Sequence, residues 1–216
     1  MASADPRKAA VDQSGRALGP RALQTRQRLL EATASLLNQQ SVRDLSVVDI
    51  ARKAGTSPAT FYQYFKDVSE ATLRLAEQAA EEMPAVVELI DGPWSDGQGL
   101  GRARKIVEAF LVHWDAHRAT LLVRNLAAEE GDRRFQRVRR DALRPLLEQL
   151  AARIAESQRA GRVDPVLAPA AAAAAMMSIL ERLAAYHREL EPLGLGRDEL
   201  VETCARILCQ TVGGAE

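Results

Sequence analysis

The spacing of apolar residues along the 216-residue chain is helical almost throughout. Between residues 21 and 40, one helical face is marked by residues three or four positions apart, which predicts one amphipathic helix; they are Leu29, Leu30, Thr33, Leu36 and Leu37. No segment alternates polar and apolar residues over a useful length, so the sequence predicts an all-α fold. Further helices are expected over about 46–54, 57–65, 68–90, 101–117, 119–130, 132–160, 165–190 and 197–212.

Two short helices near the amino terminus are joined by a turn. Ser46 is placed to cap the first of them, and Gly55 ends it. Pro58 fits the first turn of the next helix, which is too short to be stable in isolation. Phe61 and Phe65, four residues apart, must therefore pack it against its neighbours. This is the layout of a helix-turn-helix, whose second member can enter a DNA major groove.

The side of the third helix that faces away from the phenylalanine pair carries residue types that can read DNA. At about 100° per residue, this side holds Ala59, Thr60, Gln63 and Lys66, with Tyr62 and Tyr64 flanking them. Glutamine can pair with adenine, small methyl groups can contact thymine, and Tyr or Lys can reach phosphates. An ordinary helical corner with a polar outer face would show the same periodicity.

Charge is distributed unevenly although the formal net charge is zero. Residues 1–66 carry ten Lys/Arg against five Asp/Glu, whereas residues 67–216 carry 19 against 24. A basic amino-terminal part suggests a polyanionic partner, and a charged surface without a partner is the alternative. Residues 1–20 have no periodicity and are expected to form a mobile arm, whose Arg7, Lys8 and Arg16 either follow a DNA groove or stay in solvent.

The stretch from about Thr25 to Phe65, above all LSVVDIARKAGTSPATFYQYF, resembles the DNA-binding domain of the TetR family of bacterial transcriptional regulators. The rest of the chain is similar in length and helix order to a TetR-type ligand-binding and dimerisation domain. The resemblance implies a DNA-binding domain over 21–66 and an effector-binding and dimerisation domain over 67–216.

The resemblance also implies roles for individual residues. Phosphate contacts would come from Ser46, Thr56, Ser57, Tyr62 and Tyr64, and base contacts from Ala59, Thr60 and Gln63. The family usually has a lysine three residues beyond the last phenylalanine of this motif, where this chain has Val68. Lys66 is the candidate to supply the missing cation.

A TetR-like chain is expected to act as a homodimer on a palindromic operator and to be released by a small-molecule effector, which makes a repressor the favoured function. Apolar stripes suited to a dimer interface lie on the last two helices, unless the monomer's own core uses them; they comprise Ile179, Leu180, Leu183, Leu200, Cys204, Ile207, Leu208 and Thr211. The alternative function is a TetR-shaped interaction protein that binds a protein partner instead of DNA, which only Val68 favours.

Candidate effector contacts lie on the expected interior helices. His113 and His117 share a helical face and could bind a metal or serve as polar groups of a pocket. Since no cysteine or carboxylate cluster accompanies them, no metal site is expected. The effector-binding candidates are Trp94, Phe110, His113, Trp114, Asn125, Met177 and Tyr186, although aromatic and methionine residues at helical spacing often only fill a core.

Several classes of protein are disfavoured. The chain has no apolar stretch of membrane-spanning length and no signal-peptide pattern, so a cytoplasmic protein is expected. It lacks the sequence motifs of serine hydrolases, zinc proteases and phosphate-binding loops, so neither an enzyme nor a cofactor is expected. Cys204 and Cys209 are expected to be reduced apolar residues. RRFQRVRR at 133–140 is expected to form a solvated surface with salt bridges, because acidic residues flank it closely.

Overall fold

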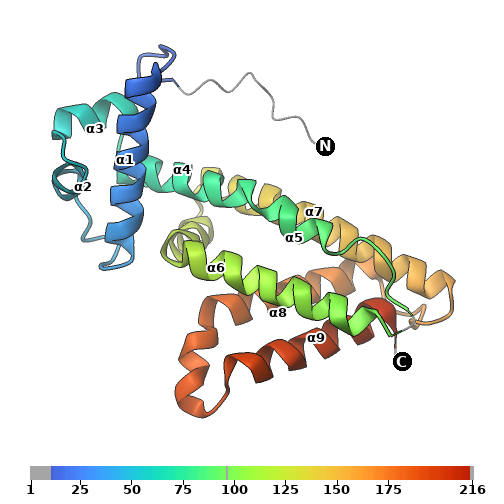
Figure 1. Ribbon diagram of the computed structural model, residues 1–216. Helices are drawn as coiled ribbons and strands as arrows, with labels where there is room; N and C mark the ends of the chain where they lie inside the picture. Colours follow the sequence, from blue (N-terminus) through green and yellow to red (C-terminus); the bar gives the residue numbers. More distant parts are fainter. Residues whose placement is uncertain (1–10, 96, 215–216) are drawn as a thin grey trace. The chain divides into compact units, whose positions relative to one another are not determined.

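The computed structural model describes residues 11–95 and 97–214 and is helical, which confirms the predicted all-α class (Figure 1). Within these ranges the only β contact is an isolated bridge between Val11 and Ala17. The elements are α1 (Pro20–Leu37), α2 (Val47–Lys53), α3 (Pro58–Tyr64), α4 (Val68–Glu81), α5 (Met83–Glu88), α6 (Gly99–Glu129), α7 (Arg133–Arg159), α8 (Pro169–Leu190), the 3-10 helix η1 (Glu191–Leu193) and α9 (Arg197–Gly213).

The chain forms two compact units. The first combines the chain up to Gln78 with Ala119–Gln136, and the second combines Ala79–Arg118 with the chain from Arg137 onward. Helices α4, α6 and α7 therefore each pass from one unit to the other. The expected domain boundary at residue 66 takes in α1 to α3, and the compact unit adds most of α4 and the second part of α6.

The first unit folds as its local sequence dictates. The Ser46 hydroxyl accepts a hydrogen bond from the Asp49 amide and caps α2, and the Ser57 hydroxyl accepts one from the Thr60 amide and caps α3. Gly55, in the turn between these helices, has a φ of +65°, which other residues adopt at a cost. Capping and the glycine turn fix where both helices begin and end.

Phe61 and Phe65 are fully buried in the core of the first unit, as predicted. They pack with Leu29, Leu30 and Ile50, which are also fully buried and come from α1 and α2. Burying a large apolar side chain contributes on the order of 2 kcal/mol. The seven-residue α3 is thus held by tertiary packing rather than by its own helical propensity.

The predicted helix over 68–90 is wrong in one respect, because the structure breaks it at Glu82. Pro84 lies in the first turn of α5, where proline is tolerated; inside a continuous helix its ring would clash with the preceding turn. The helix predicted from 165 likewise begins only at Pro169. The two helices predicted over 101–117 and 119–130 are the two parts of α6, which meet at a kink where His117 has non-helical φ and ψ (−118° and 17°).

Close backbone packing supports one end of the second unit. A Cβ atom on Gly213 would lie 2.6 Å from the Trp94 carbonyl oxygen, and one on Gly99 would lie 2.8 Å from the same atom. The Trp94 indole N–H donates to the Ile90 carbonyl at 3.0 Å, and the ring is buried. Both glycines are therefore needed for the Trp94 loop to approach α6 and α9.

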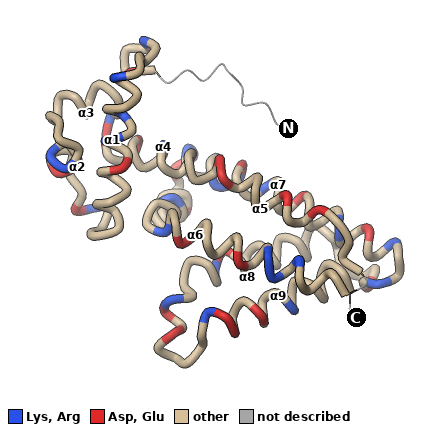
Figure 2. Tube along the Cα trace, viewed as in Figure 1, with Lys and Arg blue, Asp and Glu red and all other residues tan. Residues whose placement is uncertain are grey.

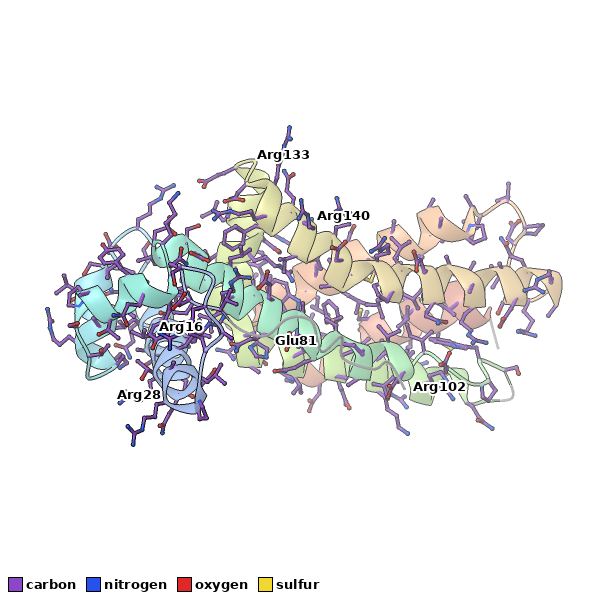
Figure 3. All side chains as sticks on the ribbon, turned by 90° about the horizontal axis from the view of Figure 1, so that it is seen from above. Arg16, Arg28, Glu81, Arg102, Arg133 and Arg140 are labelled. Atoms are coloured by element: carbon purple, nitrogen blue, oxygen red, sulfur yellow. The ribbon has the colours of Figure 1, made fainter. Side chains whose placement is uncertain are left out.

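Ion pairs occupy the basic segment 133–140, as predicted. Arg134 pairs with Asp132 at 2.7 Å, Arg140 pairs with Asp141 at 3.5 Å, and Arg139 bonds to Glu181. Figure 3 shows Arg133 projecting outward from the start of α7. No helix within the described ranges is both long and apolar enough to cross a membrane.

Candidate nucleic-acid interface

Helix α3 presents the predicted candidate residues on its outer side. Ala59 and Gln63 are exposed and Thr60 is half-buried, whereas Phe61 and Phe65 are fully buried. Tyr62 is 54% exposed, with its ring edge-to-face against Phe61 at 5.8 Å. The helix thus offers a polar and small-residue surface to a partner while the phenylalanine pair anchors it from behind.

Hydroxyl groups at the starts of α2 and α3 already take part in local bonds. The Ser57 and Thr60 hydroxyls lie 3.0 Å apart, and the Ser46 hydroxyl donates to the Asp49 carboxylate at 2.5 Å. Thr56 is half-buried, and its amide donates to the Ala51 carbonyl at 2.9 Å. These side chains stabilise the helix starts, so any phosphate contact would be additional to capping.

The residues at the end of α3 divide between core and surface. Tyr64 is half-buried and packs against the core of the first unit, as does Val68 at the start of α4. Lys66 is exposed, and its backbone amide donates to the Glu70 carboxylate at 2.7 Å. Val68 thus serves packing, and the exposed cation in this short stretch is Lys66.

The segment ahead of α1 forms a tight turn on the end of α3. The Asp12 carboxylate accepts hydrogen bonds from the Ser14 hydroxyl and from the Arg16 amide, and both bonds lower the pKa of Asp12. The Gln13 amide donates to the Gln63 carbonyl at 3.0 Å, and the Gln13 side chain donates to the Tyr64 carbonyl at 3.2 Å. The expected mobile arm is thus a hydrogen-bonded turn over its described part; Arg7 and Lys8 lie outside the described residues.

This turn and α3 enclose a surface hollow of about 450 Å³. Its walls include the Arg16 and Gln63 side chains, and Gln63 remains exposed. The turn ahead of α1 therefore borders the outer surface of α3 without covering it. The complete lining is Asp12, Arg16, Ala17, Leu18, Gly19, Ala22, Gln63 and Tyr64.

Positive charge is available around this surface in the first unit. Figure 2 marks the Lys and Arg positions along α1 and α2, and Figure 3 shows Arg28 extending away from α1. Arg52 pairs with Asp49 at 3.3 Å but keeps 74% of its side chain exposed, and Lys53 is exposed. Such cations can approach a phosphate backbone with little desolvation.

Most of the predicted effector-binding residues are buried in the second unit. Phe110, His113, Trp114 and Met177 are at most 7% exposed, as is Trp94. Tyr186 is half-buried, with the Arg182 guanidinium 3.7 Å from its ring centroid. Both a packed core and an enclosed ligand pocket bury such residues, so the effector-binding assignment stays a prediction.

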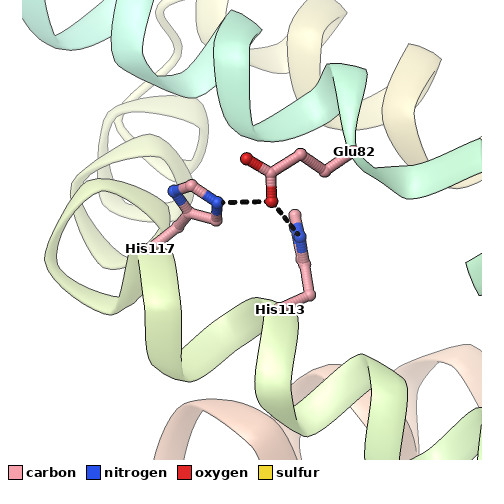
Figure 4. Close-up of side chains that lie close together, drawn as sticks. All are labelled: Glu82, His113 and His117. Carbon is pink, nitrogen blue, oxygen red and sulfur yellow. Dashed lines mark hydrogen bonds and ion pairs between the residues drawn. The ribbon is translucent and has the colours of Figure 1, made fainter. Parts of the chain in front are cut away.

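The structure separates one effector candidate from the others and adds a residue that sequence reasoning missed. Asn125 lies in the first unit, where its side chain accepts a hydrogen bond from Arg124 at 3.0 Å. Glu82, at the break between α4 and α5, reaches His113 and His117 (Figure 4). No local sequence pattern predicts this contact, because about thirty residues separate Glu82 from the histidines.

Two family models match the chain, and together they span most of it. The model described as "Tetracyclin repressor-like, C-terminal domain" matches residues 86–216. The model described as "Bacterial regulatory proteins, tetR family" matches residues 29–69, which include α2, α3 and the second half of α1. The second match thus coincides with the candidate nucleic-acid interface.

Solved structures share the fold at low sequence identity. The fatty acid degradation regulator FadR from Bacillus halodurans is 17% identical, with a TM-score of 0.61 over 92% of this chain and 98% of that one. FadR from Bacillus subtilis, solved in complex with stearoyl-CoA, is 15% identical, with a TM-score of 0.63 over 88% and 99%. SmeT, the repressor of the Stenotrophomonas maltophilia multidrug efflux pump SmeDEF, is 18% identical, with a TM-score of 0.60 over 84% and 88%; it has also been solved with triclosan.

Proposed function

Because this chain belongs to the TetR family of bacterial regulators, we propose that it is a transcriptional repressor that binds a palindromic operator as a homodimer and is released by a small-molecule effector. The observation that carries the proposal is the outer surface of α3. It exposes Ala59 and Gln63 beside the half-buried Thr60, while Phe61 and Phe65 fix its orientation from within. No catalytic role is proposed for any residue.

In this proposal, α3 lies in the major groove and Gln63 contacts a base edge. Contacts to phosphates would position the helix. They would come from Ser46, Thr56, Ser57, Tyr62, Tyr64 and Lys66. Contacts to the backbone set affinity and register, whereas contacts to bases set sequence preference. Dimer symmetry would then require two half-sites one helical turn or more apart.

Apolar side chains left exposed on α8 and α9 support dimerisation through these helices. Ile179 on α8 is 39% exposed and Ile207 on α9 is 40% exposed, whereas Leu180 and Leu208, next to them in the sequence, are buried. The monomer's own core thus uses part of the predicted stripes and leaves the rest at the surface. We expect Ile179 and Ile207 to pack against the partner subunit.

The buried aromatic residues of the second unit support an apolar effector. Two structural neighbours hold stearoyl-CoA and triclosan, and both ligands have large apolar parts. An effector that lowers operator affinity a hundredfold must favour the released state by about 2.7 kcal/mol, which differential apolar burial can supply. The proposed contacts are the candidates of the second unit, and Asn125 belongs to the first unit; these candidates are Trp94, Phe110, His113, Trp114, Met177 and Tyr186.

Selection from a library of randomised DNA duplexes tests the proposed function directly. A repressor of this kind should enrich a palindrome, and the enriched duplex should bind one dimer in native mass spectrometry. The alternative, an interaction protein without DNA binding, would enrich no palindrome; the apolar Val68 at a usual lysine position is the feature that favours it.

Paired variants test the dimer interface. Ile179→Glu combined with Ile207→Glu should shift the mass to the monomer, because two carboxylates would be buried between subunits. Val166→Glu is the matched control, since Val166 is 83% exposed in the loop before α8. A dimer that survives the double substitution would place the interface elsewhere.

A further inference from the structure

Three potential metal ligands meet where α4 ends and α6 bends. We propose that Glu82, His113 and His117 form a binding site for a divalent transition metal, with Zn²⁺ as the best match. Their side-chain ligand atoms all lie within 4.8 Å of one another. Figure 4 shows the Glu82 carboxylate turned toward both imidazole rings.

The two distances from Glu82 bracket the ligand spacing around a tetrahedral ion, and the two imidazole nitrogens lie at most 4.8 Å apart. One Glu82 oxygen, Oε2, is 2.8 Å from His117 Nε2 and 3.8 Å from His113 Nδ1. Ligand atoms about 2.0–2.1 Å from a tetrahedral Zn²⁺ lie about 3.3 Å from each other, a value between these two distances. Small side-chain movements would therefore admit the ion.

The chemistry of the three groups favours zinc over magnesium or calcium. Two imidazole nitrogens and one carboxylate oxygen form a ligand set typical of zinc sites that keep a fourth position for water or another ligand. Magnesium and calcium prefer sites made of oxygen ligands alone. Because His113 and His117 are four residues apart on α6, both nitrogens approach from the same side.

The two histidines of the cluster are largely buried, whereas Glu82 is exposed to solvent. The His113 side chain is 6% exposed and that of His117 is 25% exposed, so packing on α6 restricts both rings. The Glu82 side chain is 58% exposed, which leaves access for an ion. The carboxylate also supplies negative charge that helps to compensate the charge of the metal.

Both backbone segments that carry the ligands are irregular at the site. Glu82 separates α4 from α5, and His117 has a φ of −118° that bends α6. All three ligands belong to the second unit. A bound ion would thus join the start of α5 to the bend in α6 and should raise the melting temperature.

Cobalt and zinc titrations of tag-free, chelator-treated full-length protein test the site. Co²⁺ should bind one ion per chain with the intense visible absorption of tetrahedral coordination, and Zn²⁺ should displace it and raise the melting temperature. Glu82→Gln and His117→Ala should each weaken Zn²⁺ binding by more than about a hundredfold, because each removes a direct ligand.

A matched pair of variants separates coordination from general charge. Glu81→Gln removes the neighbouring exposed carboxylate and should leave Zn²⁺ affinity unchanged. Because Glu82 is itself exposed, Glu82→Gln should remain folded even if His113→Ala does not. The proposal is overturned if the protein binds no ion, or if Glu82→Gln and His117→Ala bind Zn²⁺ like Glu81→Gln; the three residues would then form only a hydrogen-bonded helix contact.

Discussion

On α3 of the first unit, Ala59, Tyr62 and Gln63 are exposed among the side chains assigned to recognition, whereas those assigned on the part of α6 in the second unit are buried. Tyr62 is 54% exposed, while Phe110 and Trp114 are at most 1% exposed. A macromolecule such as DNA can be contacted only at an exposed surface, and a small ligand can be enclosed within a unit. Exposure of α3 thus supports its assignment to DNA binding, whereas burial in the second unit fits a packed core and an enclosed ligand equally well.

They also differ in how far apart in sequence the functional residues lie. On α3, the candidate base contacts fall within one short helix, and its phenylalanine spacing alone sets their orientation. The cluster of Glu82, His113 and His117 joins two segments separated by about thirty residues. Single substitutions can therefore alter the surface of α3 one contact at a time, whereas the cluster of Glu82, His113 and His117 depends on the packing of the second unit.

The largest expected effect is on the stability of the first unit. Phe65→Ala should destabilise it by about 3–5 kcal/mol, because Phe65 is fully buried and its removal leaves a cavity. Hydrogen exchange followed by mass spectrometry should show faster exchange in α1 to α3. Tyr62→Ala, at an exposed position, should change stability by less than about 1 kcal/mol; equal effects of the two substitutions would show that α3 is oriented differently.

A smaller loss is expected in the second unit from Gly213→Ala. Its new Cβ would lie 2.6 Å from the Trp94 carbonyl oxygen, so we expect a destabilisation of about 1–3 kcal/mol in chemical denaturation. Gly101→Ala is the matched control: Gly101 lies in α6 with no atom within 4 Å of the added Cβ, and alanine there should stabilise by up to about 1 kcal/mol. Opposite signs for the two substitutions would support the close approach of the Trp94 loop.

Recognition itself should respond to Gln63→Ala. The substitution should relax base preference at one operator position by about 1–3 kcal/mol, whereas Tyr62→Phe should weaken all duplexes to a similar extent. Parallel selections from the same randomised library would measure both. Unchanged selectivity in Gln63→Ala would remove this residue from the base contacts.

The smallest expected effect is on the reactivity of the Cys204 thiol on α9. Burial raises the pKa of its thiol to about 11 from the usual 9.0, so at pH 8 its thiolate fraction should fall about a hundredfold. Peptide-level mass spectrometry should find much slower alkylation of Cys204 in native than in denatured protein. Because the folded-state pKa is raised, this thiol's contribution to stability is complete below pH 9 and is lost as the pH rises toward 11. Rapid alkylation of native protein would show that α9 opens readily.

The sequence predicts the first unit better than the second, for a physical reason. The capping, turn and packing residues of the first unit can be inferred from their spacing, because each affects the backbone within a few residues of itself. They are Ser46, Gly55, Ser57, Phe61 and Phe65. The break at Glu82 had a local signal in Pro84, which the helical periodicity of 68–90 outweighed. The contact of Glu82 with His117 had no such signal, since it depends on the tertiary fold that brings the break after α4 to the bend in α6.

The bond from Gln13 to the last turn of α3 has a practical consequence. Trimming the chain through Gln13 would remove two hydrogen bonds from the end of the helix proposed to face the operator. Operator affinities measured on such a shortened protein would therefore belong to a chain whose α3 lacks these hydrogen bonds. A purification tag at the carboxyl end would leave this attachment intact.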